Sequence, residues 1–298
     1  MSNTLSEPPP SPSPSQQKPI SKWLRGALIG KGTHGCVYLG MDSTTGEILA
    51  VKQVEIHRNG GRDDSMQTSA VEILKLQCDI LKDLDHPNIV KCLGFEQTSD
   101  FANMFMEYVA GPSLAELLRE YGKFEDGLVR TFTGQVLEGL EYLHDKGIIH
   151  RDLKTDNLLI GPSGHIKICD FKCAMKANDI HVNDILSRAE MQGSVFWTTP
   201  EVIQAESDGA HQIGYNEKVD IWSLGFVVLD MLAGRRLWHE ADGIGLLVQS
   251  VKRQYFPLIP NDVVLSPGAD DFIRKCFAMK PDERPSASDL RKHPYVES

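Results

Sequence analysis

The sequence predicts an α+β fold of two lobes: a small N-terminal lobe built on an antiparallel sheet, and a larger, mainly helical C-terminal lobe. Three observations lead to this expectation. The chain has 298 residues, a length typical of about two domains of ~150 residues. Strand-like segments and a glycine-rich turn occupy its first part, and helical apolar spacing follows. Hydrophobic residues make up 41% of the chain, which is ample for a core.

The expected boundaries give a tail over residues 1–22, the small lobe over 23–109 and the helical lobe over 110–298, with an active site in the cleft between the lobes. Prolines and serines alternate from Pro8 to Pro14, and such a run cannot build a packed core. We expect a disordered tail with polyproline character. Three roles stay open: recruitment of a proline-binding domain, phosphorylation at Ser11 and Ser13, or no role.

The first element of the small lobe is a hairpin around a glycine-rich loop. Residues 28–39 read LIGKGTHGCVYL, with Gly30, Gly32 and Gly35 between two apolar segments. Glycine lets backbone N–H groups approach phosphate oxygens because no Cβ is in the way. A dinucleotide-binding fold has the same glycine spacing, but it needs a helix directly after the glycines, and residues 36–39 are strand-like.

The next expected strand, Glu47 to Val54, carries Lys52 beside the glycine loop. From there a lysine can reach the α- and β-phosphates of a nucleotide. Lys52 alone is better explained as an exposed strand lysine. Its place after the glycine loop and before the acidic loop described below favours phosphate binding instead.

Three further segments complete the small lobe. The family resemblance given below implies a helix over residues 70–84, and a loop over 57–69 precedes it. Residues 105–109 are expected to form a strand that enters a hinge to the second lobe.

In the second lobe, residues 131–145 have apolar side chains at helical spacing, and Gly147 ends that helix. A short extended piece (148–149) and a polar loop (150–157) follow. Residues 158–160 and 166–168 then alternate across a Gly-Pro-Ser-Gly turn, which predicts a hairpin. Such a hairpin places Asn157 and Asp170 side by side.

The polar loop and the hairpin carry a set of side chains typical of phosphoryl transfer. Asp152 can accept a proton from an attacking hydroxyl, and Asn157 and Asp170 can hold a divalent metal on a nucleotide's phosphates. A lone Asp and Asn five residues apart would be explained as a solvated polar loop. The full run from His150 to Ile160 is far more specific.

Taken together, residues 23–298 resemble a eukaryotic serine/threonine protein kinase domain. The resemblance depends on motifs that occur in the family's order: the glycine loop, Ala50-Val51-Lys52, His150-Arg151-Asp152, Asp170-Phe171, Thr199-Pro200-Glu201, Asp220 to Gly225, and Asp282 to Pro285. Lys154 is similar to the serine/threonine branch. Residues 193–197 more loosely resemble the mitogen-activated protein kinase kinase kinases.

The resemblance implies ATP and Mg²⁺ as cofactors and assigns roles to residues. Asp152 is the catalytic base or hydroxyl-positioning group, Lys154 steadies the transferring phosphoryl group, and Asn157 and Asp170 bind Mg²⁺. Met106 guards the back of the adenine pocket, and the Glu107 carbonyl and Val109 N–H bind adenine. The complete set of implied ATP-binding positions is Ile29, Gly30, Gly32, Gly35, Val37, Ala50, Lys52, Met106, Glu107, Val109 and Leu159.

Three positions depart from the family pattern. Gln77 stands where the family has a glutamate that pairs with the strand lysine, and Glu72 and Asp79 lie about 140° and 160° away from its helix face. Lys172 replaces the glycine of Asp-Phe-Gly. It either competes with Mg²⁺ for Asp170 or points to solvent, and it costs about 1–2 kcal/mol if its φ is positive. Thr199 replaces an alanine, and we expect its hydroxyl to be satisfied locally.

These departures keep alternative functions open. A pseudokinase that acts as a scaffold or allosteric partner is one. A small-molecule kinase is another, although it would not need an ion pair between Glu201 and Arg284. For an active enzyme, Arg151 beside Asp152 calls for a countering phosphate on the activation segment, and Ser187 is the predicted acceptor.

Composition narrows the partners. The net charge of −10 argues against nucleic-acid or anionic-membrane surfaces. The resemblance implies ATP and a protein substrate as partners, and it suggests a downstream dual-specificity kinase as that substrate. We expect a cytoplasmic protein because no secretory or transmembrane stretch is evident. The six cysteines lack metal-ligand spacing and are expected to be reduced thiols. Cys169 is either a thiol in the nucleotide pocket or a packed apolar side chain.

Overall fold

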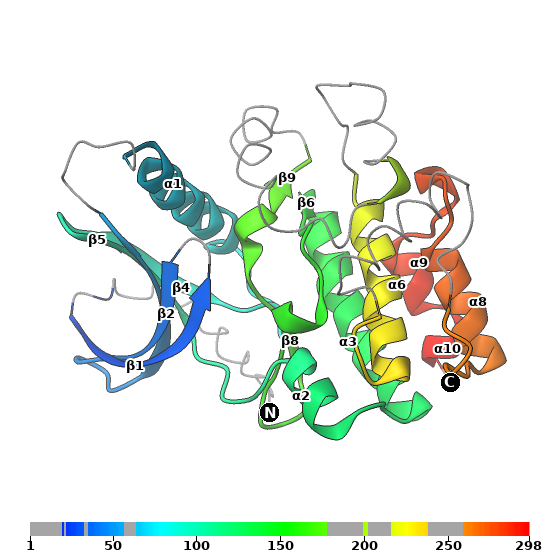
Figure 1. Ribbon diagram of the computed structural model, residues 1–298. Helices are drawn as coiled ribbons and strands as arrows, with labels where there is room; N and C mark the ends of the chain where they lie inside the picture. Colours follow the sequence, from blue (N-terminus) through cyan, green and yellow to red (C-terminus); the bar gives the residue numbers. More distant parts are fainter. Residues whose placement is uncertain are drawn as a thin grey trace, which may run out of the picture.

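The computed structural model describes residues 20, 22–32, 35–56, 64–177, 199–201, 216–237 and 259–297. The expected tail, the tip of the glycine loop and Ser187 therefore lie outside the described residues. Figure 1 shows a sheet with one long helix beside it and, on the other side of a narrow junction, a group of helices. This arrangement confirms the expected two-lobed α+β fold.

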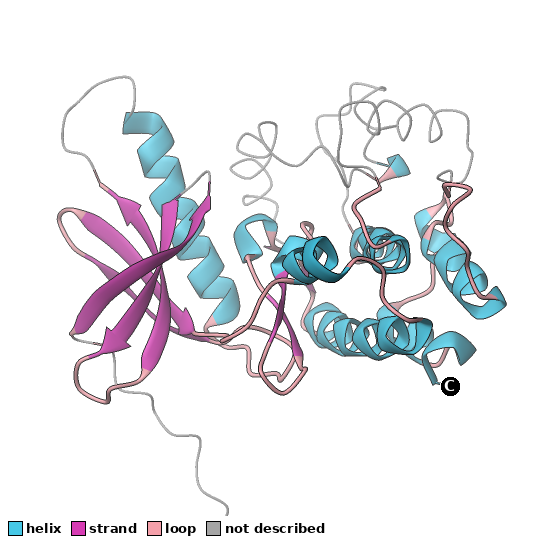
Figure 2. Cartoon of the chain, turned by 60° about the horizontal axis from the view of Figure 1, so that its bottom comes forward, coloured by secondary structure: helices cyan, strands magenta, loops and turns pink. Residues whose placement is uncertain are grey.

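The sheet of the small lobe has five antiparallel strands in the order β1-β2-β3-β5-β4 (Figure 2). These are β1 (Trp23–Gly32), β2 (Gly35–Asp42), β3 (Ile48–Glu55), β4 (Cys92–Gln97) and β5 (Phe101–Glu107). Strand side chains alternate between the two faces. On β3, Leu49 and Val51 pack with Phe105 in a small core, and Ala50 and Lys52 therefore point to the opposite face.

Helix α1 (Asp64–Leu81) packs against β3, β4 and β5. It begins six residues earlier and ends three residues earlier than expected, so the predicted loop over 57–69 is wrong from Asp64 onward. Ile73, Leu74 and Leu81 are buried on the same side of the helix as Gln77. Helical spacing brings these positions to one face, which fixes Gln77 toward the interior.

The helical lobe is built around α6 (Lys218–Ala233), most of whose residues are buried. It packs against α3 (Asp126–Asp145) and α8 (Pro267–Cys276), and Trp222 and Phe277 meet edge to face at 4.9 Å between ring centroids. Gly234 ends α6 with φ 71°, and a Cβ there would lie 2.1 Å from the Lys123 nitrogen. The remaining helices are α2 (Leu114–Tyr121), α9 (Ala287–Arg291) and α10 (Pro294–Glu297).

Short paired strands lie where the two lobes meet. Strand β7 (Leu158–Ile160) pairs with β8 (Ile166–Ile168), which confirms the predicted hairpin, and β6 (Ile148–Ile149) pairs with β9 (Met175–Lys176). The two pairs hold the loop 150–157 and the segment 169–173 next to each other. Within the described ranges, no helix combines the length and the apolar character needed to cross a membrane.

Candidate active site

The register of the first three strands places the glycine-rich positions over Lys52. Gly30 lies opposite Val37 across β1 and β2, and Val37 lies opposite Lys52 across β2 and β3. Gly35 has φ 137°, and a Cβ there would lie 2.5 Å from the Gln53 carbonyl oxygen. Only glycine meets both demands without strain. The sheet therefore brings these glycines to the same end as the Lys52 side chain.

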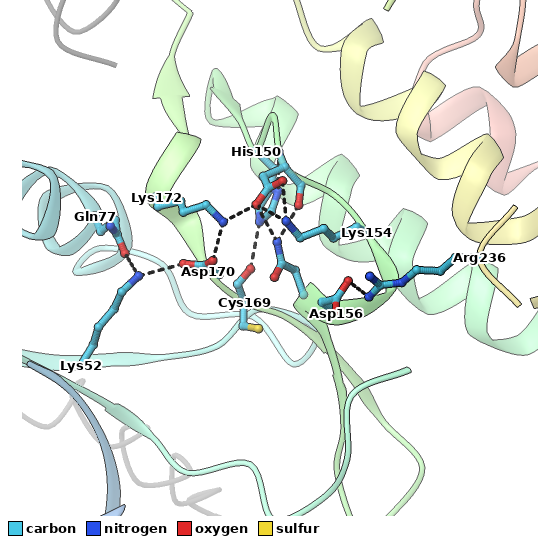
Figure 3. A network of polar contacts seen from close by, with 11 residues as sticks. Lys52, Gln77, His150, Lys154, Asp156, Cys169, Asp170, Lys172 and Arg236 are labelled. Atoms are coloured by element: carbon cyan, nitrogen blue, oxygen red, sulfur yellow. Dashed lines mark hydrogen bonds and ion pairs between the residues drawn. The ribbon is translucent and has the colours of Figure 1, made fainter. Parts of the chain in front are cut away.

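Lys52 connects the sheet to the helix and to the junction segment. Its Nζ donates to Gln77 Oε1 at 2.9 Å and to Asp170 Oδ1 at 2.8 Å (Figure 3). The predicted register of Gln77 is therefore correct. Glu72 is exposed and Asp79 pairs with Lys82, so neither acid replaces the missing glutamate.

The loop 150–157 is held from below by Asp220 of α6. The backbone N–H groups of His150 and Arg151 donate to the two Asp220 carboxylate oxygens at 2.9 and 2.8 Å, and His144 Nε2 lies 2.9 Å from Oδ2. Arg151 has φ 64°, a left-handed conformation that is costly for a residue with a Cβ. Asp220 is fully buried, and its two backbone contacts hold this turn in place.

Asp152, Lys154 and Asn157 converge on this loop. Lys154 Nζ lies 3.0 Å from both Asp152 carboxylate oxygens. Asn157 Nδ2 donates to the Asp152 carbonyl oxygen at 2.7 Å and to Oδ2 at 3.0 Å. Because the Asn157 amide nitrogen is turned toward Asp152, its amide oxygen is the atom left for a metal.

The hairpin brings Asp170 beside this loop, as predicted. The Cys169 N–H donates to the Asn157 carbonyl oxygen at 2.9 Å, and His150 Nε2 lies 3.1 Å from the Cys169 carbonyl oxygen. Asp170 itself has φ 59°. The segment that follows, residues 171–173, forms a short 3₁₀ turn, and the Phe171 ring meets the His150 ring edge to face at 4.8 Å.

Lys172 lies between the two acids. Its Nζ is 2.5 Å from Asp152 Oδ2 and 2.8 Å from Asp170 Oδ2 (Figure 3). The expectation that it points to solvent is therefore wrong, and the contact with Asp152 was not predicted. Among the described non-glycine residues, only Arg151 and Asp170 have positive φ, so Lys172 carries no left-handed strain in this structure.

The ammonium groups set the ionisation of both acids. Burial would raise the pKa of Asp170, but Lys52 and Lys172 outweigh it and hold that pKa well below its usual range. Burial opposes ionisation of Asp152 in the same way, and Lys172 and Lys154 lower its pKa. Both acids are therefore carboxylates at neutral pH. For Lys172, the two acids outweigh burial and raise its pKa, which keeps it cationic.

The residues expected to surround adenine come from the five-stranded sheet, the segment that follows β5, and β7. Ala50 is opposite Met106 across β3 and β5, and both are half-buried. The Glu107 carboxylate accepts from the Lys91 N–H at 2.7 Å and from Lys167 Nζ at 2.8 Å. That side chain is therefore occupied, and only the backbone of Glu107 is suited to a ligand. The other expected positions are at their predicted places in strands or hinge: Ile29 exposed, Val109 buried and Leu159 half-buried on β7.

The Glu201–Arg284 anchor is present. Arg284 is buried, donates from Nη1 and Nη2 to the two Glu201 oxygens at 2.8 and 2.7 Å, and lies over the Trp222 ring. Thr199, two residues before Glu201, corrects an expectation. Its Oγ1 is buried without a hydrogen-bond partner in the described part of the chain, so the added hydroxyl is not satisfied locally there.

Two contacts near the site escaped the sequence analysis. Asp156 forms an ion pair with Arg236, just past the end of α6 (Figure 3). Cys78 of α1 and Cys92 of β4 bring their Sγ atoms to 3.5 Å. Both pairs join residues far apart in sequence, and no local spacing indicates them. Cys169 is half-buried and packs against the core, and burial raises the pKa of its thiol to about 12, which favours the packed apolar side chain over a reactive thiol.

Comparison with known proteins agrees with this geometry. A model described as the protein kinase domain matches residues 23–296. The chain is 47% identical over 283 residues to the MAP kinase kinase kinase mkh1 of Schizosaccharomyces pombe, a match that covers 94% of this chain and 25% of that protein. It is 43% identical over 277 residues to the serine/threonine-protein kinase BCK1/SLK1/SSP31 of Saccharomyces cerevisiae, covering 92% and 18%.

A plant relative matches over a similar length. The chain is 39% identical over 292 residues to the mitogen-activated protein kinase kinase kinase 2 of Arabidopsis thaliana, a match that covers 98% of this chain and 43% of that protein. The chain thus spans less than half the length of all three relatives, and a quarter or less of the two fungal ones.

Proposed function

This chain belongs to the protein kinase family, and from that premise we propose that it transfers the γ-phosphoryl group of ATP to a serine or threonine hydroxyl of a protein. The convergence of Asp152, Lys154 and Asn157 on one anchored loop, beside Lys52 and Asp170, carries the proposal. Family membership covers residues 23–296, and the activity of any longer protein that contains them is part of the proposal.

In the proposed reaction, Asp152 orients the acceptor hydroxyl and takes its proton, since its lowered pKa keeps it ionised and able to accept. Lys154, whose Nζ lies 3.0 Å from that carboxylate, neutralises charge on the transferring phosphoryl group in the proposed reaction. Lys52 binds the α- and β-phosphates, and the backbone N–H groups of the Gly30, Gly32 and Gly35 loop cradle the triphosphate.

The donor atoms fit Mg²⁺. Magnesium prefers carboxylate, amide and water oxygens, and it is usually held by one or two carboxylates plus substrate phosphates. Asp170 offers a carboxylate and Asn157 an amide oxygen, and both belong to the ends of one hairpin. When bound, the metal neutralises phosphate charge and supports the departure of the leaving diphosphate. We assign both residues as its ligands.

The adenine site that we propose uses backbone atoms of the hinge together with apolar side chains. The Glu107 carbonyl accepts from adenine and the Val109 N–H donates to it. Apolar walls come from both lobes, and the proposed set is Ile29, Val37, Ala50, Met106 and Leu159. We also propose, from the resemblance to protein kinases, that the small lobe ends at residue 109 and the helical lobe begins at residue 110, with a tail before residue 23.

The substrate class follows from the relatives rather than from the site. The names of the Schizosaccharomyces pombe and Arabidopsis thaliana relatives place those two proteins in mitogen-activated protein kinase cascades. We propose that the chain acts at the same level, on a downstream dual-specificity kinase, in the cytoplasm. The Glu201–Arg284 pair supports a protein substrate over a small molecule, because the small-molecule alternative does not need that anchor.

The test is phosphate transfer from MgATP to a generic basic protein and to a catalytically inactive dual-specificity kinase. We expect incorporation on serine or threonine that Asp152→Asn lowers by about 10²–10⁴-fold, the range for loss of a general base. Equal incorporation by the wild type and Asp152→Asn would overturn the proposal. In that case the scaffold alternative would take its place.

A further inference from the structure

Five charged side chains form one connected chain of contacts where the phosphates are proposed to bind. Lys52 contacts Asp170, Asp170 contacts Lys172, Lys172 contacts Asp152, and Asp152 contacts Lys154, all within 2.5–3.0 Å. Figure 3 shows Lys52, Asp170, Lys172 and Lys154 pointing toward one another. Within this chain of described contacts, three ammonium groups face two carboxylates, so its net charge is about +1.

Two residues are responsible for this excess of positive charge. Gln77 contacts Lys52 at 2.9 Å but brings no charge, and Lys172 adds an ammonium group. A glutamate at 77 and a glycine at 172, as in the family pattern, would give the same group of residues a net charge of about −1. Gln77 and Lys172 therefore both make the net charge of this group more positive. The difference of about two charge units equals the charge of one divalent cation.

We propose that Lys172, together with the neutral Gln77, supplies cationic charge that a nucleotide triphosphate otherwise brings as a divalent ion, so that this chain binds ATP with reduced dependence on Mg²⁺. The inference depends on the nucleotide site proposed above and specifies its metal requirement. Lys172 is thereby a determinant of nucleotide binding, and the reaction still uses Asp152 and Lys154 as described.

The position of Lys172 is built into the fold. Its neighbours Phe171 and Cys173 are buried, and Phe171 packs on the His150 ring, so the backbone of residue 172 has little room to move. The ammonium group is largely shielded, with 25% of the side chain exposed, and it contacts both acids at once. A charge fixed in a partly buried site acts more strongly on a phosphate than one in bulk water.

The same contacts weaken the metal site. Both carboxylate oxygens of Asp170 accept from an ammonium group, Oδ1 from Lys52 and Oδ2 from Lys172. A divalent ion that binds Asp170 must displace one of them and enter a region that is already positive. Metal-free ATP carries about four negative charges, so this positive region attracts it.

Calorimetric titration of the folded chain with ATP tests this, once with excess Mg²⁺ and once with a chelator. The quantity to compare is the ratio of the dissociation constant in chelator to that in Mg²⁺. We expect a ratio within about threefold of one for the wild type, at least about tenfold higher for Lys172→Met, and close to the wild-type ratio for Lys172→Arg, which keeps the charge.

Gln77→Glu is an independent variant that removes the same unit of positive charge without touching Lys172. It should raise the ratio by at least about tenfold, and the double variant with Lys172→Met should raise it further. Lys280→Gln is the matched control, since Lys280 is exposed and pairs only with Glu283 among the described residues. Thermal unfolding of each variant checks that it is folded.

The outcomes separate this inference from the proposed function. ATP binding with equally strong metal dependence in wild type, Lys172→Met and Gln77→Glu overturns the inference and leaves the kinase assignment intact. Tighter binding by Lys172→Met in chelator also overturns it, because Lys172 would then only block the site. No binding by any variant, with or without Mg²⁺, overturns both.

Discussion

Lys52 on β3 and Gln77 on α1 are joined by a 2.9 Å hydrogen bond between an ammonium group and a neutral amide oxygen. The Gln77 side chain is buried, and its Nε2 finds no hydrogen-bond partner in the described ranges. The contact that docks α1 on the lysine is therefore a hydrogen bond with one charged partner and not an ion pair, and it leaves one buried donor unsatisfied.

Gln77→Glu should strengthen this contact. The present bond has one charged partner, the Lys52 ammonium group, and the substitution gives it two, which strengthens it, while the unsatisfied amide group disappears. At saturating Mg²⁺ we expect kcat/KM for protein phosphorylation to rise about five- to tenfold. Steady-state kinetics measure this, with Glu72→Gln on the exposed side of α1 as the control. An unchanged or lower kcat/KM would show that the missing charge at residue 77 does not limit activity.

Arg284→Ala should destabilise the helical lobe severely. Arg284 is buried, makes a bidentate pair with Glu201 and donates from Nε to the Ala278 carbonyl oxygen at 2.7 Å. Removal of one partner of a buried ion pair costs about 3–5 kcal/mol. Urea unfolding should show a loss of that size. Arg274→Ala removes an exposed pair with Asp270 and should change stability by less than about 1 kcal/mol. Similar losses for both variants would contradict the anchoring role of Arg284.

Asp230 should make stability depend on pH. It lies near the end of α6, and burial raises its pKa to about 8, opposed only weakly by the hydrogen bond from the Leu237 N–H. The folded state thus holds this proton more tightly than the unfolded state. Its contribution to stability is fully present below the ordinary pKa of 3.8, is lost progressively as the pH rises from there to about 8, and levels off above that pH.

Asp230→Asn removes this titration and can keep the Leu237 contact through its amide oxygen. The free energy of unfolding of the variant relative to the wild type should therefore rise between pH 5 and pH 9, by at least about 1 kcal/mol. Urea unfolding at several pH values provides the measurement. A difference that stays constant with pH would mean that Asp230 is ionised in the folded protein.

Cys169 should react slowly with thiol reagents despite its place next to Asp170. With a pKa of about 12, its thiolate fraction at neutral pH is on the order of 10⁻⁵, and the thiolate is the reactive form. Mass spectrometry after iodoacetamide treatment of the native chain should find little modification of Cys169, although it is half-buried as Cys36 is. Rapid labelling of Cys169 would show that its surroundings are more open than the structure indicates.

The sequence was sufficient to predict the elements that depend on local pattern. Alternating apolar residues and a Gly-Pro-Ser-Gly turn predicted the β7–β8 hairpin, and helical spacing placed Gln77 on the inner face of α1. The start of α1 was placed six residues too late, because residues 64–69 carry few apolar side chains. Helix ends of this kind are set by tertiary contacts more than by local propensity.

Contacts across long sequence separations could not be predicted in the same way. Lys172 was expected either at Asp170 or in solvent, and its contact with Asp152 depends on how two loops approach each other. The same holds for the pairs Asp156–Arg236 and Cys78–Cys92. The roles of the site residues, and the phosphorylation site at Ser187, remain predictions from the sequence pattern.

The Lys52–Asp170 ion pair spans the two lobes, whereas the loop that carries Asp152 is tied to α6 within one lobe through Asp220. A hinge motion that opens the molecule would stretch the first contact and leave the second unchanged. The proposed nucleotide contact and the proposed acceptor-binding loop therefore depend on different interactions. Such an opening would release the proposed nucleotide and leave the geometry of the proposed acceptor-binding loop unchanged.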